Sequence, residues 1–328
     1  MSAKPWIEVR GIYGGVPETL LVDGSTLADH GLNALWLRSD AITADIVDRV
    51  HGQSSRIFAE FNSMHHAAYL AEHPDAAPVG TDGLPCPPPD GWQGICPTHE
   101  GYRRSRMAEF ERLLAELDID GIWLDYHHAH ASWEQAEPNL PDTCFCNRCL
   151  SRFRDETGTD TDPHNLSTEW VTWRCKVFTE WVREYAEIRD RVRPSALLGT
   201  FHCPWTGTDR DGALTKKLAI DLRAQAAYVD VFSIMPYHAR FGHSDDIGWI
   251  SRQTEWLRGY LGSDKRIWPI VQLSDWGEKV SAVDVPLILD AATTPPSTGV
   301  MVFSWGSLAA QQDKVAALVD FYRHVAKA

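Results

Sequence analysis

Four cysteines surround one isolated carboxylate in the middle of this sequence. Cys96 opens "CPTHEG", Cys144, Cys146 and Cys149 form C-x-C-x2-C in "CFCNRC", and Asp125 lies between them in "GIWLDYHH". Four thiolates complete the tetrahedral shell of zinc and leave no position for a substrate, so such a site is structural. Its binding energy is on the order of 10 kcal/mol, enough to fasten two long loops together. The spacing therefore predicts a structural zinc ion held by these four cysteines.

Other interpretations of the thiols remain open at this stage. Cys86 is a weaker candidate for the fourth ligand, and the cysteines could be reduced and carry no metal. Cys146 and Cys149 have the C-x-x-C spacing of redox proteins, but the surrounding elements do not follow the order of a thioredoxin-like fold. The chain has seven cysteines and does not begin with an apolar run of signal-peptide length. This combination favours reduced thiols or metal ligands over a disulfide framework.

Short apolar runs alternate with longer amphipathic segments along the whole chain. Each run is rich in branched and aromatic residues, as strands covered on both faces are. Eight strands that alternate with helices predict a (β/α)8 TIM barrel, and without a repeat or a linker the whole chain, 1–328, is expected to form one domain. The expected strands cover residues 6–14, 32–40, 56–63, 121–128, 196–203, 229–238, 266–276 and 299–306.

Two helices and two long loops can be placed around these strands. Residues 101–120 carry apolar side chains at spacings of three and four, and Ser167 is a suitable N-cap for a helix that ends at Pro194. Residues 74–97 and 129–147, after the third and fourth strands, are too long for simple barrel loops. Loops of this length are usually functional or need an external restraint, which the thiols can supply.

The carboxyl ends of the expected strands carry polar and aromatic side chains together. In TIM barrels the active site lies at this end. A sugar suits such a mixture, because its hydroxyl groups need hydrogen-bond partners and its ring faces stack on aromatic rings. The residues expected to bind a carbohydrate substrate are Tyr13, Arg38, His65, His127, His128, His202, Tyr237, His238, Gln272, Trp276 and Trp305.

Asp125 is the strongest catalytic candidate, because it follows four apolar residues that a strand would bury. A charge at that place is costly unless it is paired or used, although a carboxylate that only bonds a neighbouring loop is the simpler alternative. Glycoside hydrolysis needs two carboxyl groups, one to protonate the leaving oxygen and one to attack or to activate water. Glu60 and Asp275 are the candidate partners, followed by Asp40.

Two other kinds of function compete with a glycosidase. One is a carbohydrate-binding barrel that has lost its second carboxylate and catalyses nothing. The other is a metal-dependent hydrolase with histidine ligands, although the first strand lacks the H-x-H motif usual in that class. Its candidate ligands are His65, His66, His127, His128, His130, His202 and His238.

The net charge of the chain is −14, which argues against nucleic acid as a partner. No stretch approaches the length of a membrane-spanning segment. We therefore expect a cytoplasmic protein that acts on a carbohydrate, without a membrane or nucleic-acid partner, and that could form a homo-oligomer.

Residues 96–158 resemble the central part of family 42 beta-galactosidases and of related hypothetical glycoside hydrolase barrel families. The shared order is a cysteine before the third barrel helix, a carboxylate that ends the fourth strand, and then C-x-C-x2-C. The resemblance implies zinc at the four cysteines and a proton donor at Asp125. The sequence departs from the family in two places: Leu124-Asp125 stands where the family has Asn-Glu, and Gln272, with Asp275 beyond it, stands near the place of the strand-seven nucleophile. An aspartate at the end of strand four could also act as the nucleophile, as it does in other barrel glycosidases.

Overall fold

The computed structural model describes residues 7–262 and 265–327. Trp6, the first residue of the first expected strand, lies outside this part of the chain. Nine parallel strands form one sheet in the order β7-β6-β5-β4-β3-β2-β1-β9-β8. The strands are β1 (Val9–Tyr13), β2 (Ala34–Arg38), β3 (Arg56–Asn62), β4 (Gly121–Asp125), β5 (Leu197–His202), β6 (Val231–Ile234), β7 (Arg266–Ile267), β8 (Ile270–Gln272) and β9 (Gly299–Phe303).

The sheet closes into a barrel because its two end strands belong to one stretch of chain. Only Trp268 and Pro269 separate β7 from β8. Trp268 N–H donates to the carbonyl of Phe232 at 3.1 Å, and Pro269 C=O accepts from Met301 N–H at 2.9 Å, so the stretch is bonded on both sides. Proline has no N–H to donate, which explains the break in the strand. The predicted (β/α)8 barrel is confirmed, with its seventh strand in two pieces.

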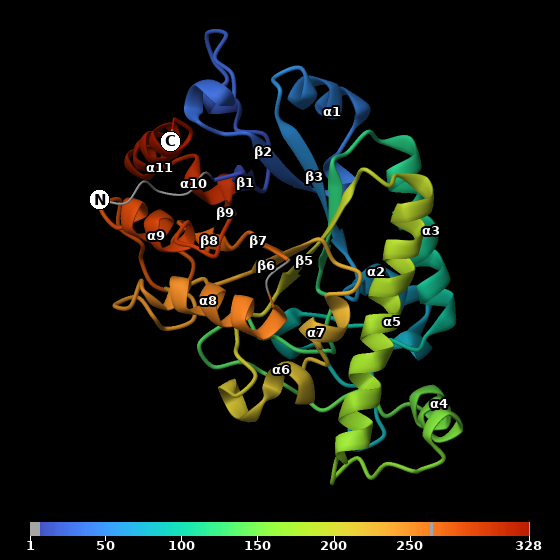
Figure 1. Cartoon of the computed structure of the whole chain (residues 1–328). Helices are drawn as coiled ribbons and strands as arrows, with labels where there is room; N and C mark the ends of the chain where they lie inside the picture. The colour runs from blue at the N-terminus through green and yellow to red at the C-terminus, as the bar shows by residue number, and fades with distance from the viewer. Residues whose placement is uncertain (1–6, 263–264, 328) are drawn as a thin grey trace.

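Helices cover the outside of the barrel (Figure 1). The long helices α3 (Glu100–Glu116) and α5 (Thr168–Val192) pack side by side, and Ser167 caps α5 through a hydrogen bond from Trp170 N–H at 3.1 Å, as predicted. The connection from β1 to β2 contains only the 3-10 turns Glu18–Leu20 and Ala28–His30. The α-helices are α1 (Ala44–His51), α2 (Ala67–Glu72), α3 (Glu100–Glu116), α4 (Asn147–Thr157), α5 (Thr168–Val192), α6 (Ala213–Lys216), α7 (Leu222–Gln225), α8 (Trp249–Leu261), α9 (Val285–Ala292), α10 (Trp305–Leu308) and α11 (Gln312–Val325).

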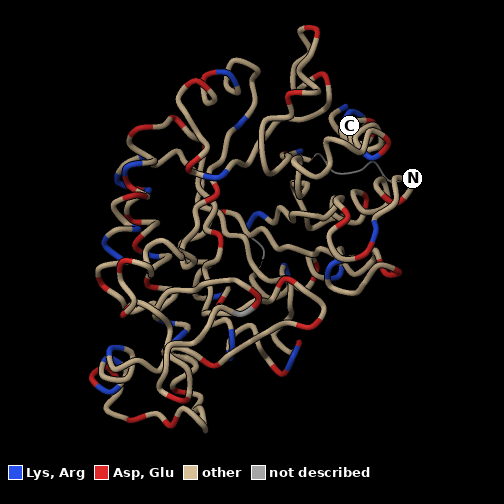
Figure 2. Tube along the Cα trace, turned by 180° about the vertical axis from the view of Figure 1, so that it is seen from behind, with Lys and Arg blue, Asp and Glu red and all other residues tan. Residues whose placement is uncertain are grey.

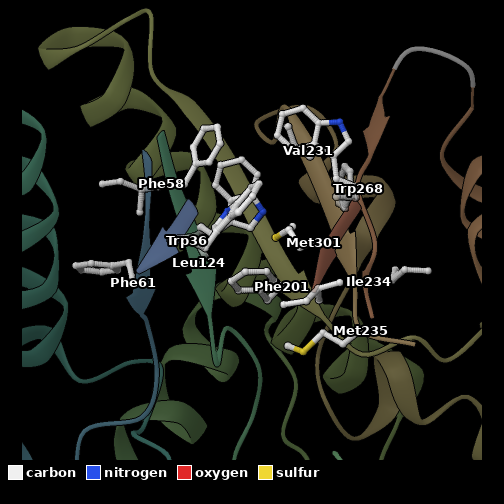
Figure 3. Packing of buried hydrophobic residues seen from close by; sticks show 14 of the residues in the cluster. Trp36, Phe58, Phe61, Leu124, Phe201, Val231, Ile234, Met235, Trp268 and Met301 are labelled. Carbon is white, nitrogen blue, oxygen red and sulfur yellow. The ribbon is translucent and has the colours of Figure 1, made fainter. Parts of the chain in front are cut away.

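Three tryptophans fill the amino-terminal part of the barrel interior. Trp36, Trp123 and Trp268 are fully buried, and Trp123 stacks on Trp268 with 5.7 Å between ring centroids. Neighbouring strands carry glycine where the rings pass: a Cβ on Gly11 would lie 2.2 Å from Trp36, and a Cβ on Gly199 would lie 2.1 Å from Trp123. Figure 3 shows Trp36 in the space between the strands. The interior is thus packed solid below the carboxyl ends of the strands.

The opposite faces of the strands pack against the helices. Phe61 of β3 contacts Phe110 of α3 and Tyr185 of α5, with ring centroids 5.4 and 5.7 Å away. Acidic and basic residues alternate over the outside of the chain, including the outer helices (Figure 2). In the described part of the chain, no helix is long and apolar enough to cross a membrane.

Candidate active site and cysteine cluster

Two carboxyl groups meet at the carboxyl end of the barrel. In the register of β3 and β4, Glu60 lies opposite Trp123 and Asn62 lies opposite Asp125. Since Trp123 points into the barrel and side chains alternate along a strand, Asp125 and Glu60 also point inward. The two side chains share a hydrogen bond. The structure therefore brings Asp125 together with Glu60, the first of its two predicted partners.

Two further donors hold this pair in place. The Tyr13 hydroxyl donates to Glu60 Oε2 at 2.6 Å, and the N–H of Tyr126 donates to Asp125 Oδ1 at 2.9 Å. Glu60 is only 7% exposed. Because neutral phenol and amide donors stabilise a carboxylate, they offset part of the cost of placing negative charge in this buried position.

Burial dominates the electrostatics of the pair. It raises the pKa of Asp125 well above its usual range, and the negative charges of Glu60 and Glu134 raise it further. Burial also raises the pKa of Glu60, whereas the hydrogen bond from Tyr13 and the charge of Arg38 lower it. Two carboxyl groups in direct contact cannot both ionise easily, so they act as a unit that retains a proton between them.

The residue after Asp125 has a strained backbone. Tyr126 has a φ of 51°, in the left-handed region that residues other than glycine rarely adopt. This conformation costs on the order of 1 kcal/mol and is common at functional sites. Here it ends β4 abruptly and points the amide of Tyr126 at the Asp125 carboxyl group.

A cleft with two lobes opens above the pair. The inner lobe has a volume of about 230 Å³ and contains Asp125 and Glu134. The outer lobe, of about 560 Å³, contains Glu60, Arg38 and Asp40. The residues that line both lobes, and so form the boundary between them, are Tyr13, Trp92 and Tyr126.

Aromatic side chains form much of the inner lobe. The Tyr237 ring is tilted against those of Phe303 and Trp276, with centroids 5.2 and 5.8 Å away, and the Trp92 ring is tilted against that of Tyr126 at 5.0 Å. Flat apolar walls with a few carboxyl groups between them suit a ligand that has both ring faces and hydroxyl groups. The aromatic residues of this lobe are Tyr13, Trp92, Tyr126, Phe201, Tyr237, Trp276 and Phe303.

Glu134, which sequence reasoning missed, is the second carboxyl group of the inner lobe. It comes from the irregular loop between β4 and α4, where no periodicity marks it. Arg240 Nε donates to the main-chain carbonyl of Glu134 at 2.6 Å, and the preceding Trp133 donates from Nε1 to His128 at 2.9 Å. The pKa of Glu134 is raised to about 7, mainly by burial. The positive charge of Arg240 opposes this rise, and the negative charge of Glu60 adds to it.

Five of the predicted substrate-binding residues lie in the cleft. Tyr13, Tyr237 and Trp276 line the inner lobe. Arg38 and His65 line the outer lobe, where Arg38 Nε donates to Asp40 at 3.1 Å. His65 Nε2 is buried and has no hydrogen-bond partner in the described residues, so it is available to a ligand.

His127 and His128 lie outside both lobes, in contrast to the prediction. The ring of His127 contacts Ser63 Oγ at 2.8 Å and the Phe178 carbonyl at 2.9 Å, so both nitrogens are engaged between β4 and α5. His128 Nδ1 contacts the Ala129 carbonyl at 2.7 Å. Burial lowers the pKa of each imidazole to about 4. These contacts tie the loop after β4 to its surroundings.

The remaining predicted binding residues also lie away from the two lobes. His202 and His238 are buried, with only 4% and 3% of their surface exposed, and Trp305 is 6% exposed at the start of α10. The Gln272 side chain accepts from Arg240 N–H at 3.1 Å and donates to the carbonyl of Ser274 at 2.8 Å. Gln272 therefore ties loops together at the rim.

Asp275, the other predicted partner of Asp125, is engaged elsewhere. Lys314 Nζ lies 2.7 Å from Asp275 Oδ1, and Val280 N–H donates to the same oxygen at 3.0 Å. These bonds lower the pKa of Asp275, although burial opposes them. Asp275 lies three residues beyond the end of β8 and lines neither lobe.

The four cysteines predicted to bind metal converge in one place. All four Sγ atoms lie within 4.8 Å of one another, and Cys96 Sγ lies 3.5 Å from Cys146 and 3.7 Å from Cys149. Tetrahedral zinc with sulfur at 2.3 Å requires sulfur–sulfur separations of about 3.8 Å. The geometry fits such an ion, and in the part of the chain that the structure describes no second group of metal-ligand side chains converges, at the histidines or elsewhere.

The cysteine cluster joins the two long loops to the helices. Cys96 precedes α3, Cys144 follows β4, Cys146 caps α4 and Cys149 lies within it. Val79 N–H donates to Cys144 Sγ at 3.3 Å, which adds the loop after β3. Contact with the other thiols, Cys144 first, lowers the pKa of Cys146, and aromatic residues of α4 and α5 enclose the cluster.

No protein-family model matches this chain, and no curated protein matches it. Solved structures do share its fold. The glycoside hydrolase domain of PgaB (BpsB) from Bordetella bronchiseptica superposes with a TM-score of 0.70 at 13% identity, over 97% of this chain and 99% of that domain. Gan42B, a GH42 beta-galactosidase from G. stearothermophilus, gives 0.70 at 12% identity, and the beta-galactosidase from Rahnella sp. R3 gives 0.67 at 15%.

These matches cover 99% of this chain but 58% of each beta-galactosidase, so the chain spans little more than half the length of those enzymes. The likeness to family 42 is thereby confirmed at the level of the fold. The chain has the TIM-barrel fold of these glycoside hydrolases.

Proposed function

We propose that this protein is a glycoside hydrolase that uses the carboxyl groups at the end of β3 and β4. The observation that carries the proposal is the buried Asp125–Glu60 pair in an aromatic cleft at the carboxyl end of the barrel. A glycosidic bond that breaks leaves positive charge on the sugar ring, and buried negative charge stabilises it. The similar solved structures named above come from glycoside hydrolases and support the same class.

The substrate we propose is a carbohydrate that occupies both lobes. Trp92 and Tyr126 stand at the boundary, where they can stack on a sugar ring, and the Asp125–Glu60 pair lies beside it, with Asp125 in the inner lobe and Glu60 in the outer lobe. Arg38, Asp40 and Asn62 in the outer lobe can hydrogen-bond to hydroxyl groups of a second unit. The bond to be cleaved would then lie across the boundary.

We further propose that the cysteine cluster holds structural zinc. Four buried thiols at the spacing of a tetrahedral shell are the ligands that zinc prefers, and Arg148 lies close enough for Cys96 and Cys146 to raise its pKa. The ion would supply stability and a fixed geometry for the loops after β3 and β4, which carry Trp92 and Glu134. It would take no part in bond cleavage, because four thiolates leave no open position.

The test is turnover of a panel of aryl alpha- and beta-glycosides and natural oligosaccharides by the wild type, Asp125→Asn and Asp275→Asn. We expect Asp125→Asn to lose turnover and to keep sugar binding. Asp275→Asn is the matched control, because its carboxylate lies outside the cleft. It should keep turnover per folded molecule while thermal unfolding shows the loss of the Lys314 ion pair.

Asp125→Asn should be more stable than the wild type at neutral pH, whereas Asp275→Asn should be less stable. A carboxyl group with a raised pKa resists ionisation in the folded state, so the wild type loses stability as the pH rises above the ordinary range of aspartate. Asparagine has no such dependence, and the variant should gain relative stability at neutral pH.

A wild type that binds sugars and turns over no member of the panel would contradict the proposed hydrolysis and would indicate a carbohydrate-binding barrel.

A further inference from the structure

The carboxyl groups of Asp125, Glu60 and Glu134 differ in what surrounds them. Asp125 accepts the Tyr126 N–H and Glu60 accepts the Tyr13 hydroxyl, and the two share a hydrogen bond. No donor contacts the Glu134 side chain within the described residues; Arg240 bonds only to its main-chain oxygen. Hydrogen bonds to a carboxylate favour its ionised form, whereas burial without them favours the neutral acid.

This asymmetry divides the cleft into two functional parts. Because two carboxylates in contact repel each other, the Asp125–Glu60 pair retains a proton between its carboxyl groups, and its two donors favour negative charge on the pair. Glu134 is a separate carboxyl group that lines the same inner lobe as Asp125. Because Asp125 and Glu60 contact each other directly, they are too close to flank a sugar, whose two catalytic carboxyl groups stand about 5 Å or more apart. A second group, set apart from the pair, is therefore needed.

We propose that Glu134 is the proton donor of the reaction, and that the Asp125–Glu60 pair supplies the negative charge at the sugar ring. This inference rests on the proposed glycosidase function. It moves the donor from Asp125, where the family resemblance places it, to the loop between β4 and α4.

The Glu134 carboxyl O–H gives its proton to the glycosidic oxygen as the bond from C1 to that oxygen breaks, and the bonding electrons leave with the oxygen as an alcohol. The pair stabilises the positive charge that develops at C1. Water then bonds to C1 and loses a proton to one of the cleft carboxylates, which restores the starting protonation through exchange with solvent.

The loop that carries Glu134 is positioned firmly enough for this role. Trp133, next to it, is only 4% exposed, its indole N–H is bonded to His128, and its ring stacks on Phe241 with 6.1 Å between centroids. Arg240 holds the main chain of Glu134 itself, and its guanidinium lies 4.7 Å from the centre of the Trp276 ring. The side chain of Glu134 can thus face the lobe while its backbone stays fixed.

The experiment compares Glu134→Gln with Glu137→Gln, an exposed glutamate of the same loop, on two substrates of the sugar found by the panel. The 2,4-dinitrophenyl glycoside has a leaving group that needs no proton, and the unsubstituted phenyl glycoside has one that does. For Glu134→Gln we expect kcat/KM to fall roughly 100- to 10,000-fold on the phenyl glycoside and far less on the dinitrophenyl glycoside. Glu137→Gln should match the wild type on both.

The pH profile gives a second, independent readout. With the phenyl glycoside, the alkaline limb of the wild-type profile should report a group with a pKa near that of Glu134, about 7, and Glu134→Gln should lose this limb. Equal losses on both glycosides would show that Glu134 only positions the substrate, and an unchanged variant would show that it is not involved. Either result would overturn the assignment of Glu134 as the proton donor and leave the proposed glycosidase function intact. A wild type without turnover would overturn both the assignment and the proposed function.

Discussion

The hydrogen bond from Tyr13 to Glu60 can be removed with little change to packing. Tyr13→Phe keeps the ring, which stacks on Phe303 with 5.4 Å between centroids and meets Phe201 edge-on at 6.0 Å. The variant loses only the hydroxyl group that donates at 2.6 Å to a glutamate with 7% of its surface exposed. The perturbation is thus confined to the hydrogen bonding of the Asp125–Glu60 pair.

The expected magnitude follows from the strength of that bond. Hydrogen bonds to charged groups contribute about 1.5 to 3 kcal/mol. If the pair carries negative charge in the transition state, Tyr13→Phe should lower kcat/KM roughly 10- to 150-fold, since each 1.4 kcal/mol is a factor of ten. The pKa of Glu60 should rise, because the lost donor favoured its ionised form, so the acidic limb of the pH profile should move to higher pH.

The assay is the pH dependence of kcat/KM for the wild type and Tyr13→Phe, with Tyr260→Phe as the control. Tyr260 lies on α8 and stacks on Trp256, outside both lobes of the cleft. Thermal unfolding should show that both variants are folded. An acidic limb that stays in place or moves to lower pH in Tyr13→Phe would refute the argument that this hydroxyl keeps the pair ionised.

Two further predictions concern the metal and the barrel interior. Elemental analysis should find one zinc per chain in the wild type and in Cys86→Ser, whose thiol lies outside the cluster, and a deficit in Cys149→Ser. Removal of the metal by a chelator should lower the unfolding temperature and the turnover together, and a metal-free protein unchanged in both would contradict the structural role. Gly199→Ala should cost about 1 to 3 kcal/mol in denaturant unfolding, because the new Cβ would lie 2.1 Å from the buried Trp123 ring. Gly259→Ala, with open space around its Cα on α8, should instead stabilise the helix by about 0.5 to 1 kcal/mol, and equal effects of the two changes would contradict the packing argument.

The sequence was sufficient to predict the barrel because its strands are short apolar runs, covered on both faces, that alternate with amphipathic helices. The four apolar residues before Asp125 placed this carboxyl group correctly at the inner rim, two residues after the inward-facing Trp123. The prediction failed two residues later, at His127. The left-handed backbone of Tyr126 reverses the alternation of inward-facing and outward-facing side chains, so His127 faces α5 and not the cleft. Backbone conformation of this kind leaves no mark in a hydrophobic pattern.

Residues on irregular loops were beyond prediction for a related reason. Trp92 and Glu134 reach the cleft from loops whose paths depend on contacts far away in the sequence, such as Arg240 with the main chain of Glu134. Asp275 illustrates the converse, because its position near a strand end suggested catalysis, whereas Lys314 of α11 engages it. The cysteines were easier to interpret, since their spacing along the chain carries most of the information about their site.

The tryptophan packing below the cleft restricts how a long polymer could be handled. Trp36, Trp123 and Trp268 leave no passage along the barrel axis, since each is fully buried against its neighbours. A chain therefore cannot be threaded through the molecule and released from the far side. Every ligand must enter and leave through the same open end of the cleft. An internal bond of a polysaccharide could be reached only if the polysaccharide chain lay across that opening, with both of its ends in solvent.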